Sequence, residues 1–180
     1  MKAKTKLRAF IIAVAIVATA FPLSAQSQSK PDPFAPIRFL VGHWQGTSAG
    51  QPGQGKGERT YEFVLRGGYI RGTNKTIYPP QGKNPKGETH EDIGIFSYDK
   101  QRKRLVLRQF HVEGFINTYV QDDGSNLSFT TEAIENIPAG WRARESYQII
   151  SKDEFIERFE LAEPGKEFEP YSESRWKRIR

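Results

Sequence analysis

Cysteine is absent from the 180 residues of this chain. Its absence excludes disulfide bonds, catalysis by a thiol and metal sites built from thiolates. It also excludes a lipid-modified cysteine as a membrane anchor. A domain that works in an oxidising compartment must then be held by its own packing and hydrogen bonds, which favours a closed architecture over a loop-rich one.

Long apolar segments are scarce too, and the one present lies near the N terminus. Residues 9–21 are almost wholly apolar, follow four basic residues and precede the small residues Ser24 and Ala25. This order is typical of a cleavable export signal, and thirteen residues are too few to cross a bilayer comfortably. We therefore expect a signal peptide over 1–25, a flexible tether over 26–33, and a periplasmic or secreted protein with no membrane anchor after cleavage. An uncleaved anchor is the alternative.

The excess of positive charge is small once that signal is removed. Four of the 27 Lys and Arg residues lie within 1–25 and none of the 21 Asp and Glu residues does, which leaves 23 against 21, or +2, in the expected mature chain. This balance provides no electrostatic reason to bind nucleic acid or an anionic membrane surface. The expected partner is therefore a small molecule, and the sequence does not indicate an oligomeric state.

Helical periodicity is missing from the rest of the chain, apart from one short turn expected over 34–41. Segments of β-favouring residues recur instead, separated by turn-forming residues. Strands are expected around Trp44 and over 58–65, 69–78, 90–98, 103–111, 115–121, 126–134, 141–150, 154–162 and 171–179. This pattern predicts an all-β domain over 34–180, a closed antiparallel up-and-down barrel of about ten strands. A two-sheet sandwich is the alternative.

One motif stands at the start of the first expected strand, the segment 40–46 with the sequence LVGHWQG. Gly42 and Gly46 allow a closely packed backbone, and Trp44 is large enough to plug one end of a barrel. Arg178 lies on the last expected strand, which pairs beside the first strand in a closed barrel. We expect its guanidinium to cover the Trp44 ring.

This combination resembles the calycin superfamily, which includes lipocalins, fatty-acid-binding proteins and the ten-stranded nitrobindin-like barrels. Nitrobindins begin with Gly-x-Trp-x-Gly-x-Gly-x-Gly. Gly42, Trp44, Gly46 and Gly50 match this pattern, whereas Ser48 replaces one glycine. The resemblance implies a barrel that holds a small molecule in its lumen.

The resemblance also raises the question of haem. Nitrobindin-like haem proteins carry their proximal histidine seven residues before the last-strand arginine, and Tyr171 occupies that position here, counted back from Arg178. Tyrosinate ligates ferric haem in catalase. A haem protein acting on nitric oxide or peroxynitrite, with Tyr171 or His111 at the iron, is therefore an alternative, although no cofactor is otherwise expected.

The three histidines offer little obvious metal chemistry. His43 is expected on the surface beside the plug. His90 is flanked by carboxylates, but zinc usually needs three or four convergent ligands, so no metal site is expected. His111 shares one face of its strand with Leu105 and Leu107. It lies either in the barrel interior or at the solvated rim.

Two acids fall on strand faces that are otherwise apolar. Alternation places Glu145 with Tyr147, and it gives Glu157 a similarly apolar face. If those faces point inward, each carboxylate needs a partner, such as Arg71 or Arg175. A slip of one residue would instead put both acids in solvent.

Enzymatic motifs are absent from the sequence. There is no Gly-x-Ser-x-Gly elbow and no His-Glu-x-x-His motif, and the glycine-rich segment 53–57 is expected to be a mobile loop at the barrel mouth. We therefore expect a binding protein rather than an enzyme, with a small, partly apolar ligand in its lumen. The side chains expected to hold the polar end of that ligand are His111, Tyr119, Tyr147, Glu157 and Tyr171. A hydrolase or isomerase that uses an interior acid, and an envelope interaction module without a ligand, are the alternatives.

Overall fold

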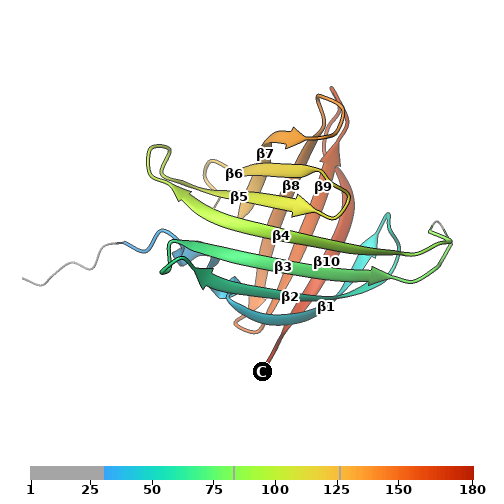
Figure 1. The fold of residues 1–180 in the computed structure, drawn as a ribbon, viewed down its shortest axis with the longest axis horizontal. Coiled ribbons are helices and arrows are strands. Elements are labelled where there is room, and N and C mark those ends of the chain that lie inside the picture. Colours follow the sequence, from blue (N-terminus) through green and yellow to red (C-terminus); the bar gives the residue numbers. More distant parts are fainter. Residues whose placement is uncertain (1–30, 83, 126) are drawn as a thin grey trace, which may run out of the picture. The chain divides into compact units, whose positions relative to one another are not determined.

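A computed structural model describes residues 31–180 except 83 and 126 (Figure 1). The expected signal peptide, 1–25, and residues 26–30 of the expected tether lie outside the described residues. Among the described residues, no helix is long and apolar enough to cross a bilayer. Within the expected tether over 26–33, Asp32 forms an ion pair with Arg38 at 2.6 Å. One compact unit extends from Asp32 to Arg180.

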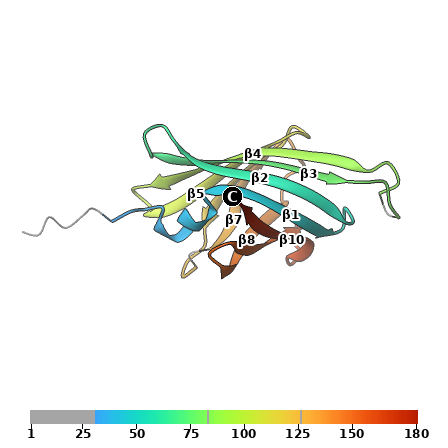
Figure 2. The same ribbon diagram turned by 90° about the horizontal axis from the view of Figure 1, so that it is seen from below.

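The ten strands of the described chain form a closed antiparallel barrel, which confirms the expected fold class. β1 pairs with both β2 and β10, so the sandwich alternative is wrong; Figure 2 shows β1 and β10 side by side. A short 3₁₀ helix, η1 (Ala35–Leu40), precedes the barrel. The strands are β1 (Gly42–Gly50), β2 (Gly55–Val64), β3 (Tyr69–Tyr78), β4 (Glu88–Asp99), β5 (Arg104–His111), β6 (Ile116–Gln121), β7 (Ser128–Glu135), β8 (Arg142–Ser151), β9 (Glu154–Ala162) and β10 (Glu169–Ile179).

Closure of the barrel is reinforced where β1 meets β10. The Arg178 guanidinium lies 4.1 Å from the centre of the Trp44 ring. It also donates hydrogen bonds of 2.7 Å to the carbonyl oxygens of Phe39 and Val41. The indole N–H of Trp44 donates to the carbonyl of Leu40 at 2.6 Å. One arginine therefore joins the last strand to the end of η1 and to the first strand.

The two motif glycines of β1 leave room for these side chains. Gly42 has a φ of +135°, and a Cβ built there would lie 2.2 Å from the Arg178 guanidinium. A Cβ at Gly46 would lie 2.6 Å from the Trp176 ring. A larger residue at either position would have to displace a packed side chain, and at Gly42 the positive φ also disfavours any residue with a Cβ.

The glycine-rich segment 53–57 differs from the expectation of a mobile loop. β2 begins at Gly55, so the second half of the segment belongs to the barrel wall. A Cβ at Gly55 would lie 2.7 Å from the Tyr78 ring, and one at Gly57 would lie 2.9 Å from the Trp176 ring. The glycines accommodate neighbouring aromatic rings, a role that local sequence does not distinguish from a flexible loop.

The barrel interior divides along its length into two parts. In the part next to η1, which we call the closed half, buried apolar side chains fill the space, and the Trp44 and Phe155 rings meet edge to face with centres 4.7 Å apart. The largest of these side chains are Ile37, Leu40, Trp44, Phe96, Tyr119, Phe129, Phe155 and Trp176. The opposite part, the open half, surrounds a cavity.

Candidate functional site

A cavity of about 600 Å³ occupies the open half of the barrel. One side of its wall is mainly apolar and comes from β7 to β9 and the adjoining loops. The apolar side chains include Ile134, Ile137, Pro138, Trp141, Phe159 and Leu161. The other side and the floor come from β2 to β6 and carry charged and polar groups, with Glu145 and Glu157 joining them from β8 and β9.

A buried ion pair forms part of the floor. Arg59 of β2 and Glu157 of β9 lie 2.5 Å apart, and their side chains are 9% and 8% exposed. The Arg59 guanidinium also lies 4.4 Å from the Trp176 ring centre, and the Trp176 indole donates to Glu157 at 3.2 Å. Burial by itself would lower the pKa of Arg59, but the neighbouring Glu157 carboxylate raises it above its ordinary value. Arg59 is therefore a permanent cation in the interior.

The partner of Glu157 corrects one expectation. Arg71 pairs with Glu62, and both side chains are about half exposed. Arg175 is also about half exposed and pairs with Glu154 at 2.6 Å. Neither arginine reaches the lumen. Arg59 lies on the same face of β2 as Gly57 and Tyr61, which are both buried, so the alternation of β2 is the sequence signal for this inward arginine.

Glu145 is the second buried acid and lies beside the ion pair. It is 3% exposed and accepts a hydrogen bond from the Tyr147 hydroxyl. Burial raises the pKa of Glu145 well above its ordinary value, and the nearby Glu157 carboxylate raises it further. The fold therefore favours the protonated form of Glu145, because burial and the neighbouring Glu157 carboxylate both disfavour its negative charge, which Arg59 opposes only in part.

The five residues expected to bind a ligand fall into two groups. His111, Glu157 and Tyr171 line the cavity. Tyr119 and Tyr147 are buried in the closed half, outside the described cavity wall. Tyr119 accepts a hydrogen bond of 2.8 Å from the amide of Asn117, which lines the cavity, so Tyr119 helps to hold Asn117 in place.

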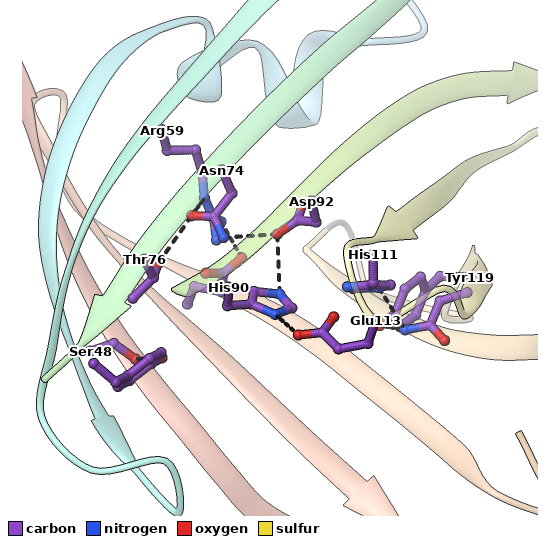
Figure 3. Close-up of polar contacts among 12 residues, drawn as sticks. Ser48, Arg59, Asn74, Thr76, His90, Asp92, His111, Glu113 and Tyr119 are labelled. Carbon is purple, nitrogen blue, oxygen red and sulfur yellow. Dashed lines mark hydrogen bonds and ion pairs between the residues drawn. The ribbon is translucent and has the colours of Figure 1, made fainter. Parts of the chain in front are cut away.

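A cluster of His90, Asp92 and His111 lies on the polar wall (Figure 3). Antiparallel pairing of β4 with β5 places Asp92 opposite His111, and His90 lies two residues before Asp92 on the same strand face. One possible ligand atom from each residue lies within 4.8 Å of the others. The His90 ring contacts Glu113 at 2.9 Å through Nδ1 and Asp92 at 3.5 Å through Nε2. The sequence alone did not predict that His111 lies beside His90 and its neighbouring carboxylates, because this depends on the pairing of β4 with β5.

The two histidines have opposite protonation. Burial would lower the pKa of His90, but hydrogen bonds to Asp92 and Glu113 outweigh it and raise the pKa to about 9. Burial dominates at His111 and lowers its pKa to about 4, although the Asp92 carboxylate partly opposes that change. At neutral pH an imidazolium therefore stands beside a neutral imidazole.

Two buried polar atoms of this wall are unsatisfied. His111 Nδ1 and Asn117 Oδ1 have no hydrogen-bond partner within the described chain. The other ring nitrogen of His111 contacts the Asn117 amide nitrogen at 3.3 Å, and the ring stacks on Phe115 with centres 4.1 Å apart. Buried polar atoms are rarely left without partners, so this part of the wall is suited to a bound group.

Asn74 connects the histidine cluster to the floor. Its amide donates to Asp92 at 2.8 Å, and its oxygen accepts from Arg59 at 3.3 Å. Burial would raise the pKa of Asp92, but His90, Arg59 and Asn74 together keep it below its ordinary value. Asp92 is therefore an ionised carboxylate in a continuous polar network.

The cavity does not fit haem held in the manner that the resemblance implies. Tyr171, at the position of the proximal histidine, is half-buried and meets Phe159 edge to face. Burial raises the pKa of its hydroxyl, and the Glu88 carboxylate raises it further, so the tyrosinate that would ligate iron is disfavoured. His111, the other candidate, is stacked on Phe115 and held by Asn117.

Comparison with known proteins supports the fold. No protein-family model and no curated protein matches the chain. The crystal structure of Rv2717c from M. tuberculosis is similar, with a TM-score of 0.58 and 17% identity over 83% of this chain and 99% of that one. A de novo designed fluorescence-activating β-barrel also matches, with a TM-score of 0.42 and 13% identity over 78% of this chain and 94% of that one. The likeness to Rv2717c concerns the architecture alone.

Proposed function

We propose that this protein is an exported β-barrel that binds a small, partly apolar molecule in its lumen. The observation that carries the proposal is the cavity of about 600 Å³ with one apolar and one polar wall. Ligand sites commonly have volumes of about 300–1,000 Å³ and combine apolar walls with a few polar groups. Export is supported by the signal pattern over 1–25.

The two walls suggest how such a ligand is oriented. Its apolar body would lie against Trp141, Phe159 and Leu161, where each Å² of apolar surface removed from water contributes about 25 cal/mol. Its polar end would face His111 and the Arg59 network. Because the floor charges compensate one another, a neutral group that donates and accepts hydrogen bonds is favoured over a strongly charged one.

The nitrobindin-like part of the resemblance belongs to the same proposal. The Gly42, Trp44 and Gly46 motif and the Arg178 contact support a barrel of that kind. The proposed ligand takes the place of haem, because Tyr171 does not suit iron. The protein would therefore share an architecture with nitrobindins but not their cofactor.

Native mass spectrometry of protein purified from its own host compartment tests the proposal. We expect a bound small molecule that is lost in Ala143→Phe, because Ala143 is fully buried and lines the cavity. Ala133→Phe is the matched control, since Ala133 is exposed on β7. Thermal unfolding would verify that both variants are folded.

A second measurement covers protein that has lost its ligand during purification. The probe is 8-anilinonaphthalene-1-sulfonate, whose fluorescence should increase with the original protein and with Ala133→Phe but not with Ala143→Phe. If no molecule copurifies and the dye does not distinguish the two variants, the lumen is not a binding site.

A further inference from the structure

We propose that His90, Asp92 and His111 bind one divalent first-row transition-metal ion on the polar wall of the cavity. This goes beyond the proposed lumen-binding function and does not depend on an apolar ligand. The three side chains are brought together by two paired strands, and each offers a nitrogen or oxygen atom of the type such ions prefer (Figure 3).

The spacing of the three side chains is compatible with a single ion. Two ligands held about 2.1 Å from a tetrahedral metal lie about 3.4 Å from each other. His90 Nε2 and Asp92 Oδ2 are already 3.5 Å apart. One ligand atom from each of the three residues lies within 4.8 Å of the others, so small side-chain rotations would complete the site.

His90 is oriented as a metal ligand in a carboxylate–histidine–metal arrangement. Its Nδ1 faces Glu113 at 2.9 Å, which leaves Nε2 on the side of Asp92. Histidines that bind metals usually donate their second ring N–H to a carboxylate or carbonyl. The acids that now stabilise a proton on His90 would stabilise a metal ion at the same place.

The other two ligands are also supported. Asp92 accepts a hydrogen bond of 2.8 Å from Asn74, which holds its carboxylate in place. Asn117, which is 1% exposed, contacts His111 Nε2. These partners stand on strands β3 and β6, so the site is supported by the barrel wall rather than by loops.

The unsatisfied atoms form a second, independent observation. His111 Nδ1 and Asn117 Oδ1 are both buried without a partner among the described residues. A half-turn of the Asn117 amide would let Oδ1 accept from His111 Nε2–H and from the Tyr119 hydroxyl. His111 Nδ1 would then present its lone pair to the ion, and the Asn117 amide nitrogen would take the place that the unpartnered oxygen holds now.

The ligand set limits which ion fits. Two imidazoles and one carboxylate suit Zn²⁺, Co²⁺ or Fe²⁺ and are poor ligands for Mg²⁺ and Ca²⁺, which prefer oxygen. Three protein ligands leave at least one coordination position open. All three residues line the cavity, so that position would be accessible to water or to the polar end of a ligand.

Titration of purified, metal-free mature protein with Zn²⁺ tests the inference, with the visible absorption of added Co²⁺ as an independent signal of nitrogen and oxygen coordination. We expect one ion per chain. His111→Ala and Asp92→Asn should each weaken Zn²⁺ binding at least tenfold. His43→Ala is the matched control, because His43 is exposed on β1 and is the one histidine of the chain outside the cluster.

Three outcomes would overturn the site: no one-to-one binding, binding that survives in His111→Ala, or binding that is lost in His43→Ala. Circular dichroism would establish that each variant is folded, and Asp92→Asn keeps the shape of the side chain. Ala143→Phe, the cavity-filling variant, leaves the three ligands unchanged. Metal binding and ligand binding can therefore fail separately.

Discussion

The closed and open halves of the barrel are built from the same strands but have opposite interiors. In the closed half, β9 contributes Phe155 to an aromatic cluster with Trp44 and Trp176. Two residues later the same strand contributes Glu157 to a buried ion pair. One strand thus changes from the apolar core to the polar floor of the cavity within a single step of alternation.

Tryptophan substitutions should give the largest difference between the two halves. Trp44→Ala leaves a large void beneath η1 and removes the ring under Arg178, so we expect a loss of about 3–5 kcal/mol of stability. Trp141→Ala, on the partly exposed cavity wall, should cost about 1 kcal/mol or less. Urea unfolding measures the free energy of unfolding of both variants. Equal losses of stability would contradict the division of the barrel into a closed and an open half.

Removal of an interior cation should rank next. Arg59→Met leaves Glu157 buried without its counter-ion, and we expect a loss of about 3 kcal/mol at neutral pH. The control is Arg71→Met, because the Arg71–Glu62 pair is about half exposed, and its loss should cost less than about 1 kcal/mol. Chemical denaturation compares the two variants. If Arg59→Met has the same free energy of unfolding as the original protein, the Arg59–Glu157 pair does not stabilise the floor of the cavity.

Glu145→Gln should have a smaller effect of opposite sign. The pKa of Glu145 is raised in the folded state, so the folded protein holds a proton that the unfolded chain releases above about pH 4.5. Stability therefore falls as pH rises above that value, and this cost should disappear with glutamine. We expect Glu145→Gln to be more stable than the original at pH 7 and nearly equal to it at pH 4; a decrease at pH 7 would mean that the carboxylate is ionised.

Histidine titration would sharpen the comparison without any substitution, because both cluster histidines lie in the open half. NMR should report a pKa of about 9 for His90 and about 4 for His111. The sign follows from each shift: His90 contributes stability below about pH 6.5 that is lost as pH rises through 9. His111 is neutral when folded, so stability is lost as pH falls from about 6.5 toward 4. Two values close to 6.5 would mean that this wall is open to solvent.

Much of the fold could be predicted because its signals are local. The strand pattern, the turn residues and the motif of Gly42, Trp44 and Gly46 can be read within short windows of sequence. The glycine-rich segment 53–57 shows the limit of such windows. Its last residues belong to β2 because Tyr78 and Trp176 pack against them, and neither ring is near in sequence.

The candidate site was predictable only in part, for the same reason. Alternation grouped His111, Glu145 and Glu157 with apolar neighbours on their strands, because the period of a strand is a property of that strand alone, but it left open whether those faces point inward. It did not show that Arg59, 98 residues from Glu157 in the chain, would reach it across the lumen.

The sequence of each strand by itself therefore determined which of its residues share a face. The export pattern and the lack of cysteine are also properties of the sequence alone. Which groups meet in the interior depended on the register of β4 against β5 and on closure of β1 with β10. Those pairings joined His90 and Asp92 to His111 and set Arg178 over Trp44. Register and closure are non-local, because they arise only when all ten described strands are placed together.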